Sequence, residues 1–383
     1  MKHLKTNLTI FLFILSFFYA HSQEVQDSSD AKSVLVVEAI TDTSVSNLLT
    51  GLELNCNTFF KQAEEYFNSG KYQTCIYLLE KGLKECSLSK ENKEQALIEL
   101  IKAYLETDNL ESTDKSIKEL LKNNPNYTLN KDLVQPDFVR LYNTYRVRPL
   151  VIFSIKGGIN STLPNTINSY SILDSVDYNS PYKGRTGSHF GLSAEWDFLK
   201  NISLSTDIMF ITNNYNRKLE GARGWTLNYK EKISSVEASA NIKYYFPAGK
   251  ITPFVFAGAM INQLISAKSD VELAYQAVDR YTSKQDPYVV SQKNINVKDQ
   301  RNLNNYGALL GIGARYKYQN LMFGLETSYL IGLTNYSDPD RRYTNNDLLY
   351  NYYYVDNDFN LSRISVSVSV GYILKYSIKK KKT

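Results

Sequence analysis

The clearest pattern along the chain is an alternation of apolar and polar residues with a period of two in its C-terminal part. In the last such segment, every second side chain from Ile364 to Leu374 is apolar, with small, polar or charged residues between them. This alternation predicts a β-strand with one apolar and one polar face. Seven earlier segments share it, so eight strands are predicted. They span 151–160, 190–199, 202–210, 236–246, 251–261, 306–318, 321–333 and 364–376.

The connections between these segments alternate strictly between short and long. Short turns at one end and long polar loops at the other are typical of outer-membrane barrels. A soluble sandwich has no reason to keep every long loop at one end. We therefore predict an eight-stranded antiparallel transmembrane β-barrel over 149–378 and a basic tail over 379–383. The short turns are 199–201, 247–250 and 318–320, and the long loops are 161–187, 214–229, 266–302 and 335–360.

Residues 55–145 follow a helical period instead. Apolar side chains recur three and four positions apart from Phe59 to Phe67 and again from Cys75 to Leu83, with Gly70 between the two stripes. A second pair of helical stripes follows and ends near Pro125. This spacing predicts amphipathic helices. The expected fold class is a small all-α periplasmic domain followed by the barrel.

The helical segment resembles tetratricopeptide repeats. Setting Ala63 at the small position of the first helix aligns a group of residues with the consensus. In the second repeat, Tyr104 and Pro125 match, whereas Thr113 stands where alanine is usual. Two repeats cannot form a long superhelix, so we expect the domain to rest on the barrel or on a partner. The aligned residues are Tyr66, Gly70, Tyr72, Cys75 and Gly82.

The three cysteines lie in the first helical pair. In an antiparallel hairpin that turns near Gly70, residues whose numbers sum to about 140 face each other, as Cys56 and Cys86 do. The periplasm is oxidising. We therefore predict a Cys56–Cys86 disulfide with Cys75 reduced; the alternative is three free, half-buried thiols.

Residues 1–22 have the pattern of a secretory signal peptide. Lys2 and Lys5 precede a short apolar run, and Ala20 and Ser22 suit cleavage before Gln23. An uncleaved membrane helix is the alternative, but the run is shorter than the roughly 20 residues that a span needs. Residues 23–54 are polar and predict a flexible lead-in. Its β-prone stretch, 33–40, fits a linker strand better than a TonB box, because the chain has no room for a plug and a large barrel.

Composition narrows the chemistry. The formal net charge of +5 becomes +3 without Lys2 and Lys5, too small to indicate nucleic acid. Of three histidines, only His189 follows the signal segment, which excludes multi-histidine metal sites. The sequence has no phosphate-binding loop, paired-cysteine metal spacing or nucleophile elbow. We therefore predict no enzyme, metal or cofactor. His189 beside Ser188 and Ser193 suggests an acyltransferase only weakly, and a loop-packing histidine is favoured.

Charged residues occur on the inward face of the predicted strands, where acidic and basic side chains nearly balance. An eight-stranded barrel is just wide enough inside for side chains, so unpaired charges there would be costly. An ion or proton path is one interpretation; a closed, salt-bridged core is the one we favour. The expected network comprises Lys156, Glu195, Asp197, Asp207, Glu237, Lys243, Arg315, Lys317, Glu326, Arg363 and Lys375.

The last long loop is rich in tyrosine and carries two arginines. Tyrosine brings a large contact area with few rotatable bonds, so this loop is a candidate external contact surface. Strands that extend above the membrane would give the same composition, and both interpretations stay open. Its acidic runs, 338–340 and 356–358, are expected to form turns rather than a calcium site. The candidate contact residues are Arg341, Arg342, Tyr343, Tyr350, Tyr352, Tyr353 and Tyr354.

The whole mature chain resembles outer-membrane proteins that join a tetratricopeptide-like segment to a porin-family barrel of the PorT-like type, common in bacteria with type IX secretion. The resemblance implies architecture more than activity. It is carried by Cys56, Phe67, Gly70, Cys86, Tyr104, Pro125, Pro136, Phe138, Leu141, Tyr142 and Pro149, and by Lys156 to Asn160 in the first strand.

These observations predict an outer-membrane anchor with its helical domain and C-terminus in the periplasm, acting as a binding or scaffolding component of a cell-envelope assembly. The alternative is a narrow channel or an accessory subunit of a type IX-like transport machine. Expected partners are outer-membrane lipid, lipopolysaccharide and a periplasmic or outer-membrane protein bound through residues 55–145.

Overall fold

The computed structural model describes residues 54–130, 134–172, 180–221, 225–247, 249–275 and 288–381. The predicted signal segment and nearly all of the lead-in lie outside the described residues. By its internal contacts the chain divides into two compact units, residues 1–86 and 87–383, which are described separately. No helix in the described ranges is long and apolar enough to cross a membrane.

The first unit contains a helical hairpin made of α3 (Phe59–Asn68) and α4 (Tyr72–Glu85). Gly70 ends the turn with a φ of +71°, a conformation that favours glycine. Gly82 lets the helices approach closely, because a Cβ there would collide with the buried ring of Phe59. A disulfide joins Cys56 to Cys86 across the open end of the hairpin, and Cys75 is a buried free thiol.

The second unit begins with α5 (Lys90–Glu106), α6 (Leu110–Asn123) and α7 (Pro136–Tyr142). The side chain of Ser89 caps the N-terminus of α5, and that of Asn109 caps α6. Thr113, where the repeat consensus has alanine, is fully buried, and its hydroxyl donates to the backbone oxygen of Asn109 (2.9 Å). The threonine is therefore accommodated without an unpaired hydroxyl.

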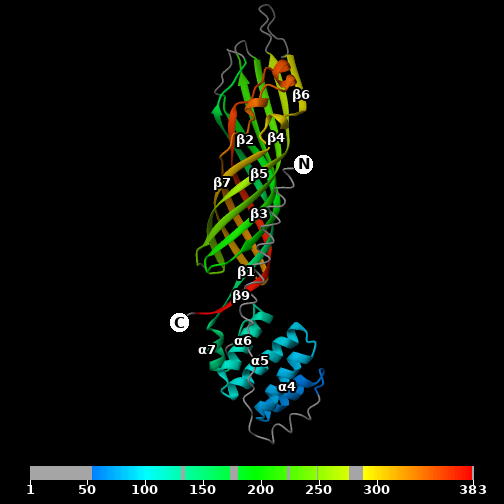
Figure 1. The fold of residues 1–383 in the computed structure, drawn as a ribbon, viewed down its shortest axis with the longest axis vertical. Coiled ribbons are helices and arrows are strands. Elements are labelled where there is room, and N and C mark those ends of the chain that lie inside the picture. Colours follow the sequence, from blue (N-terminus) through cyan, green and yellow to red (C-terminus); the bar gives the residue numbers. More distant parts are fainter. Residues whose placement is uncertain are drawn as a thin grey trace, which may run out of the picture. The chain divides into compact units, whose positions relative to one another are not determined.

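The rest of the second unit is a barrel of antiparallel strands, which confirms the predicted fold class (Figure 1). Eight strands close the ring in the order β1-β2-β3-β4-β5-β7-β8-β9, and β9 pairs back onto β1. The strands are β1 (Tyr145–Asn168), β2 (Tyr182–Trp196), β3 (Ile202–Glu220), β4 (Trp225–Tyr245), β5 (Ile251–Tyr275), β7 (Asn304–Tyr318), β8 (Leu321–Gly332) and β9 (Asp358–Lys380).

An apolar band surrounds the outside of this ring. On β9, every second side chain from Ile364 to Leu374 is exposed, whereas Ser365 and Ser367 between them, and Arg363 just before them, are buried. Outward apolar residues on the other strands extend the band, including Ile155, Leu192, Ile242 and Ile312. An apolar exterior around a polar interior is the inverse of a soluble barrel and fits a lipid environment.

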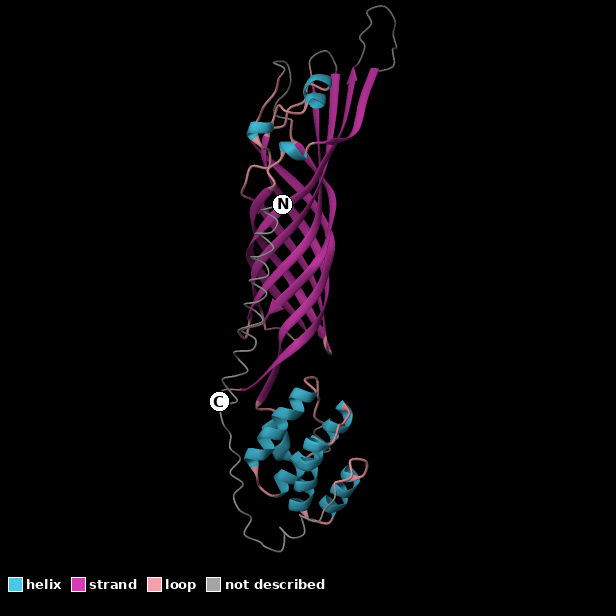
Figure 2. Cartoon of the chain, turned by 45° about the vertical axis from the view of Figure 1, so that its right-hand side comes forward, coloured by secondary structure: helices cyan, strands magenta, loops and turns pink. Residues whose placement is uncertain are grey.

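The strands are longer than predicted at the end opposite the three short turns. Most of the loop predicted at 214–229 is strand, because β3 and β4 continue far beyond the apolar band. Within 266–302, β5 continues and a ninth strand, β6 (Tyr288–Asn296), pairs with it outside the ring (Figure 2). The outward positions of β3 and β4 are polar beyond the apolar band, so this part of the sequence resembles a loop. The inward positions are still apolar or aromatic there, as at Leu219, Leu227 and Tyr229.

At the other end of the barrel, β9 runs into the segment predicted as a basic tail. Lys380 pairs with Tyr145 at the start of β1, so both ends of the barrel lie at the short-turn end.

We expect the disulfide to stabilise the first unit through the 30-residue separation that it spans. In the full-length chain, replacing Cys56 and Cys86 with serine should lower the free energy of unfolding of this unit by about 2–4 kcal/mol. Denaturant titration followed by helical circular dichroism measures this. The exposed neighbour substitution Asn57→Ser should change it by less than about 0.5 kcal/mol. Three alkylatable thiols in unreduced, unfolded protein would contradict the disulfide.

Candidate functional site

The barrel lumen contains a lattice of ion pairs. At the short-turn end, the guanidinium of Arg315 on β7 contacts Glu195 (2.7 Å) and Asp197 (3.0 Å), which lie at the end of β2. The ammonium of Lys243 on β4 reaches the other oxygen of Glu195 (3.0 Å). The Tyr245 hydroxyl also donates to Glu195, and its ring lies under the Arg315 guanidinium at 3.5 Å. Three strands, β2, β4 and β7, are thus tied together across the lumen.

The lattice continues toward the other end. Lys156 on β1 forms ion pairs with Asp207 on β3 (3.3 Å) and Glu326 on β8, and Lys243 lies 3.7 Å from Glu326. Farther along, the guanidinium of Arg363 on β9 contacts both oxygens of Glu237 on β4 (2.9 and 3.0 Å). Each of these side chains is buried or nearly so, and each pair joins strands that are not neighbours in the ring.

Nine of the eleven predicted network residues are therefore brought together, and two are not. Lys375 is exposed, and the ammonium of Lys317 lies 4.7 Å from the ring centroid of Tyr376 instead of contacting a carboxylate. Both lysines follow the inward period of their strands. They lie beyond the last ion pair of the lattice, where solvent reaches them, so their predicted place in the network is wrong.

His189 also lies in the lumen. Its Nε2 is 2.7 Å from the Ser367 hydroxyl on β9, whereas Nδ1 has no hydrogen-bond partner among the described residues. Neither Ser188 nor Ser193 makes the contact considered from the sequence. A serine–histidine pair without a third group to orient the ring, inside a closed lumen, lacks the arrangement of a catalytic triad.

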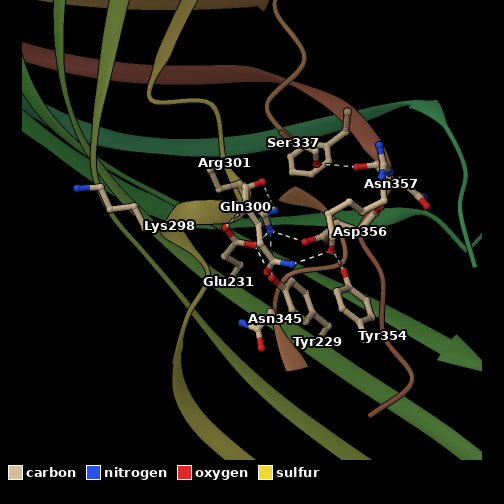
Figure 3. Close-up of polar contacts among 12 residues, drawn as sticks. Tyr229, Glu231, Lys298, Gln300, Arg301, Ser337, Asn345, Tyr354, Asp356 and Asn357 are labelled. Carbon is tan, nitrogen blue, oxygen red and sulfur yellow. Dashed lines mark hydrogen bonds and ion pairs between the residues drawn. The ribbon is translucent and has the colours of Figure 1, made fainter. Parts of the chain in front are cut away.

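A second polar cluster closes the long-loop end (Figure 3). The guanidinium of Arg301 contacts Glu231 on β4 (2.5 Å) and Asp356 in the last long loop (2.6 Å), and the Arg301 side chain is fully buried. Tyr229 donates to Glu231 (2.6 Å) and Tyr354 to Asp356 (2.7 Å). The two tyrosine rings stack at 4.2 Å.

Burial and charge act against each other in this cluster. Burial alone would lower the pKa of the Arg301 guanidinium, but the carboxylates of Asp356 and Glu231 outweigh it and hold that pKa well above its ordinary value. Burial, with the same two carboxylates, raises the pKa of the Tyr229 hydroxyl well above its ordinary range. Arg301 stays cationic and Tyr229 stays a hydrogen-bond donor at any pH that the protein would meet.

A second arginine fastens the last loop. Arg342 forms an ion pair with Asp358 at the start of β9, donates to the backbone oxygen of Asp356 (2.6 Å) and lies 3.5 Å from the centroid of the Tyr170 ring. Burial alone would raise the pKa of Asp358, but hydrogen bonds from Asn335 and Arg342 bring it below its usual value. An apolar core of the inward tyrosines and Phe359 surrounds these contacts.

The predicted external contact loop is therefore only partly a surface. Arg342, Tyr352 and Tyr354 are buried, which contradicts their assignment as contact residues. The last loop folds inward over the barrel mouth, and these three side chains fill the space there. Four of the predicted contact residues remain exposed: Arg341, Tyr343, Tyr350 and Tyr353.

Sequence reasoning missed the cluster at the mouth. Glu231 could have been found, because it continues the inward period of Glu237 through Ile233. Arg301 carries no periodic signal, since it lies between strands in the predicted loop 266–302. Its partner Asp356 belongs to an acidic run for which the sequence predicts only a turn. Only the folded loop brings the two side chains together.

A small cavity lies in the lumen between the two clusters. This cavity of about 20 Å³ is lined by Glu237, Asn262, Tyr336 and Arg363, among others, which is room for about one water molecule. The described residues contain no group of three or more histidine, cysteine or acidic side chains that could hold a metal ion. Asp338, in one of the acidic runs, accepts a hydrogen bond from the backbone of Asp340 and so forms a turn.

Comparison with known proteins gives one family match. Residues 150–338, just under half of the chain, match the model described as the outer membrane protein beta-barrel domain. No curated protein matches the chain. The match and the closed eight-stranded ring together support an outer-membrane location for the barrel.

Several solved outer-membrane barrels are similar to this chain at low scores. OprG from Pseudomonas aeruginosa is 12% identical over 61% of this chain and 98% of its own, with a TM-score of 0.33. Neisserial surface protein A is 12% identical over 58% and 97%, with a TM-score of 0.27. The outer membrane protease OmpT from Escherichia coli is 10% identical over 59% and 98%, with a TM-score of 0.23. The fold assignment rests on this chain's own strand pairings.

The Arg363–Glu237 pair offers a test of the lattice. Arg363→Met alone should destabilise the barrel by about 3–5 kcal/mol, because it leaves the Glu237 carboxylate buried without a counter-charge. Adding Glu237→Met should recover most of that loss. Urea unfolding in lipid vesicles measures both, and Lys375→Met, at an exposed position of the same strand, should change stability by less than about 0.5 kcal/mol. Equal losses in the single and double variants would contradict a paired charge.

The cluster at the mouth offers a second test. Arg301→Met leaves two buried carboxylates facing each other, so we expect amide exchange across 347–359 to accelerate about 100-fold or more while the ring stays folded. Hydrogen exchange with mass spectrometry measures this. Arg341→Met removes the same charge from an exposed position of the same loop and should leave exchange unchanged. Equal protection in Arg301→Met and wild type would rule out the ion pairs as the fastening.

Proposed function

We propose that this protein is an outer-membrane anchor that holds a periplasmic helical domain for docking a protein partner. The observation that carries the proposal is that the barrel is filled at two levels. The lumen lattice joins β1, β2, β3, β4, β7, β8 and β9, and the cluster around Arg301 fills the mouth. A barrel filled in this way serves as an anchor rather than as a path for solutes.

The charges themselves argue against a pore. Polar residues that line a water-filled channel keep their hydration, whereas these carboxylates and cations are buried and directly paired. Conduction would require several ion pairs to break together. The mouth adds buried tyrosine rings, which no hydrated ion would cross without displacing the last loop.

The orientation that we propose follows from the even strand number. The helices precede β1 and the tail follows β9, and both barrel ends lie with the short turns, which face the periplasm in outer-membrane barrels. The Cys56–Cys86 disulfide supports the same side, because the periplasm keeps such bonds oxidised.

The docking role rests on the resemblance of the helices to tetratricopeptide repeats and on the resemblance of the whole chain to proteins that join such a segment to a PorT-like barrel. In the first unit, Phe67 and Tyr72 lie at the turn of the hairpin, edge to face with ring centroids 5.4 Å apart, and both are half-buried. Aromatic side chains at a small, rigid tip are suited to protein contact. The partner that we propose is a periplasmic or outer-membrane protein of a cell-envelope assembly, such as a type IX-like machine.

Planar-bilayer recording of the purified full-length protein separates an anchor from a channel. We expect no steady conductance, because the lumen lattice and the loop at the mouth are both closed. Single channels of one reproducible size would overturn the anchor and favour a transport role.

Lysine cross-linking in native membranes tests the docking role. Exposed lysines of the helices, such as Lys61, Lys71 and Lys118, should give reproducible cross-links to a second protein. Lysines at the long-loop end, such as Lys218 and Lys293, serve as an internal control within the same chain. Cross-links confined to the control lysines, or none to another protein, would count against docking through the helices.

A further inference from the structure

Five basic side chains lie together on the outside of the barrel, above the apolar band. Lys183 and Arg185 lie on β2, Lys230 and Lys232 on β4, and Lys268 on β5, and all five are exposed. None of them forms an ion pair with a described residue, although the outward Lys218 nearby pairs with Glu220. We define these five residues as the outer basic patch.

The strand register places like charges opposite each other in this patch. Arg185 pairs with Asn214, Asn214 with Lys232, and Lys232 with Lys268, so one row across four strands carries three positive charges and no carboxylate. In the next row, Lys183, Asn216, Lys230 and Asp270 follow in the same order, with a single acid. Like charges directly opposite in a sheet are destabilising. The Lys232–Lys268 pair therefore favours an anion from outside the chain.

The height of the patch indicates what that anion is. Phe190, Phe210 and Val236 are ladder neighbours at the upper edge of the apolar band. Lys232 precedes Val236 by four residues on β4, toward the long-loop end. At about 3.3 Å per residue and a strand tilt of roughly 40°, this places Lys232 about 10 Å above that edge. The headgroup layer reaches about 5–8 Å beyond the hydrocarbon edge. The patch therefore lies just above the phosphates, and its long side chains can bend down to reach them.

The patch occupies one arc of the barrel rather than its whole rim. On β1, the outward positions at the same level are Ser161, Leu163 and Asn165. At the opposite end of the same hairpins, Lys200 and Lys250 stand singly in the short turns. The bases lie on three of four adjacent strands, β2, β4 and β5, and strands two apart are separated by roughly 10 Å. An arc of this width fits one large headgroup with several phosphates better than scattered monovalent ones.

We propose that the outer basic patch binds the phosphates of lipid A, the phosphorylated glycolipid of the outer leaflet. The site rests on the proposed orientation, with the long loops outside the cell. Lys232 and Lys268 contact one phosphate between them, which removes their mutual repulsion. Arg185, Lys183 and Lys230 surround it, and the acyl chains of the same lipid cover the aromatic edge at Phe190 and Phe210, whose rings lie 5.5 Å apart.

The test is binding of bisphosphorylated lipid A to the purified full-length protein in detergent, measured by native mass spectrometry. Lys232→Gln with Lys268→Gln should weaken binding roughly tenfold to thirtyfold. Lys200→Gln with Lys250→Gln removes the same charge from the short-turn end and should leave binding unchanged. Dephosphorylated lipid A should bind all three proteins equally weakly, and inorganic phosphate at equal ionic strength should not compete.

Thermal unfolding gives a second test, because the Lys232→Gln and Lys268→Gln substitutions should change stability in opposite directions without and with lipid A. Without lipid, the Lys232→Gln and Lys268→Gln protein should be as stable as wild type or more stable, because the repulsion is gone. With lipid A, only wild type and the short-turn variant should gain stability. Equal weakening in both double variants, no weakening in either, or competition by inorganic phosphate would overturn the lipid A site.

Orientation is tested separately in intact cells with a membrane-impermeant amine reagent. Labelling of Lys183 but not of Lys200 is the expected result. The reverse would overturn the orientation, and with it the proposed function and the assignment to outer-leaflet lipid. Failure of the detergent binding test alone would overturn only the lipid site.

Discussion

The narrow interior of an eight-stranded ring is the constraint on which the rest of this structure depends. Such a ring is only wide enough for side chains, so each inward charge must meet its partner inside the same lumen. Glu195 is satisfied by Lys243 and Arg315, which come from strands on other sides of the ring. A shift of one strand by one residue against its neighbour would turn all of its inward side chains outward. The ion pairs would then be lost, so they also stabilise the native strand register.

The lumen lattice and the cluster around Arg301 at the mouth are built from different parts of the chain. The lumen lattice uses side chains that the ring strands hold in place, so it can open only if several ion pairs break together. The seal at the mouth uses Arg301 and Asp356, which lie in connections outside the ring strands, together with Glu231 on β4. The last loop can therefore leave the mouth without breaking the ring ladder, and the ion pairs of the lumen lattice beneath it would remain.

Much of this fold follows from the period of two, and the limits of that signal explain what it missed. Where one face of a strand is exposed to lipid, the alternation of apolar and polar residues identifies the strand. Nine of the eleven charges that this alternation places on the inward face lie in the lattice. Beyond the band both faces carry polar residues, so the continuation of β3 and β4 looked like loop. The alternation shows whether a side chain points into or out of the barrel, but not how far along the barrel axis it lies. For this reason the sequence predicts Lys375 to be in the lattice, although the side chain lies beyond it. The Arg301–Asp356 contact depends on loop folding, for which the sequence has no period.

The same strand shows why the outer basic patch differs from the lumen charges. On β4, Glu231, Glu237 and Lys243 point inward, and each meets an opposite charge within the chain. Lys230 and Lys232 point outward from the same strand, and neither forms an ion pair with a described residue. The inward charges are confined and must be neutralised by the fold itself. The outward pair Lys232–Lys268 is not confined in this way, so an anion from the surroundings can compensate it. This is the role that we propose for the phosphates of lipid A.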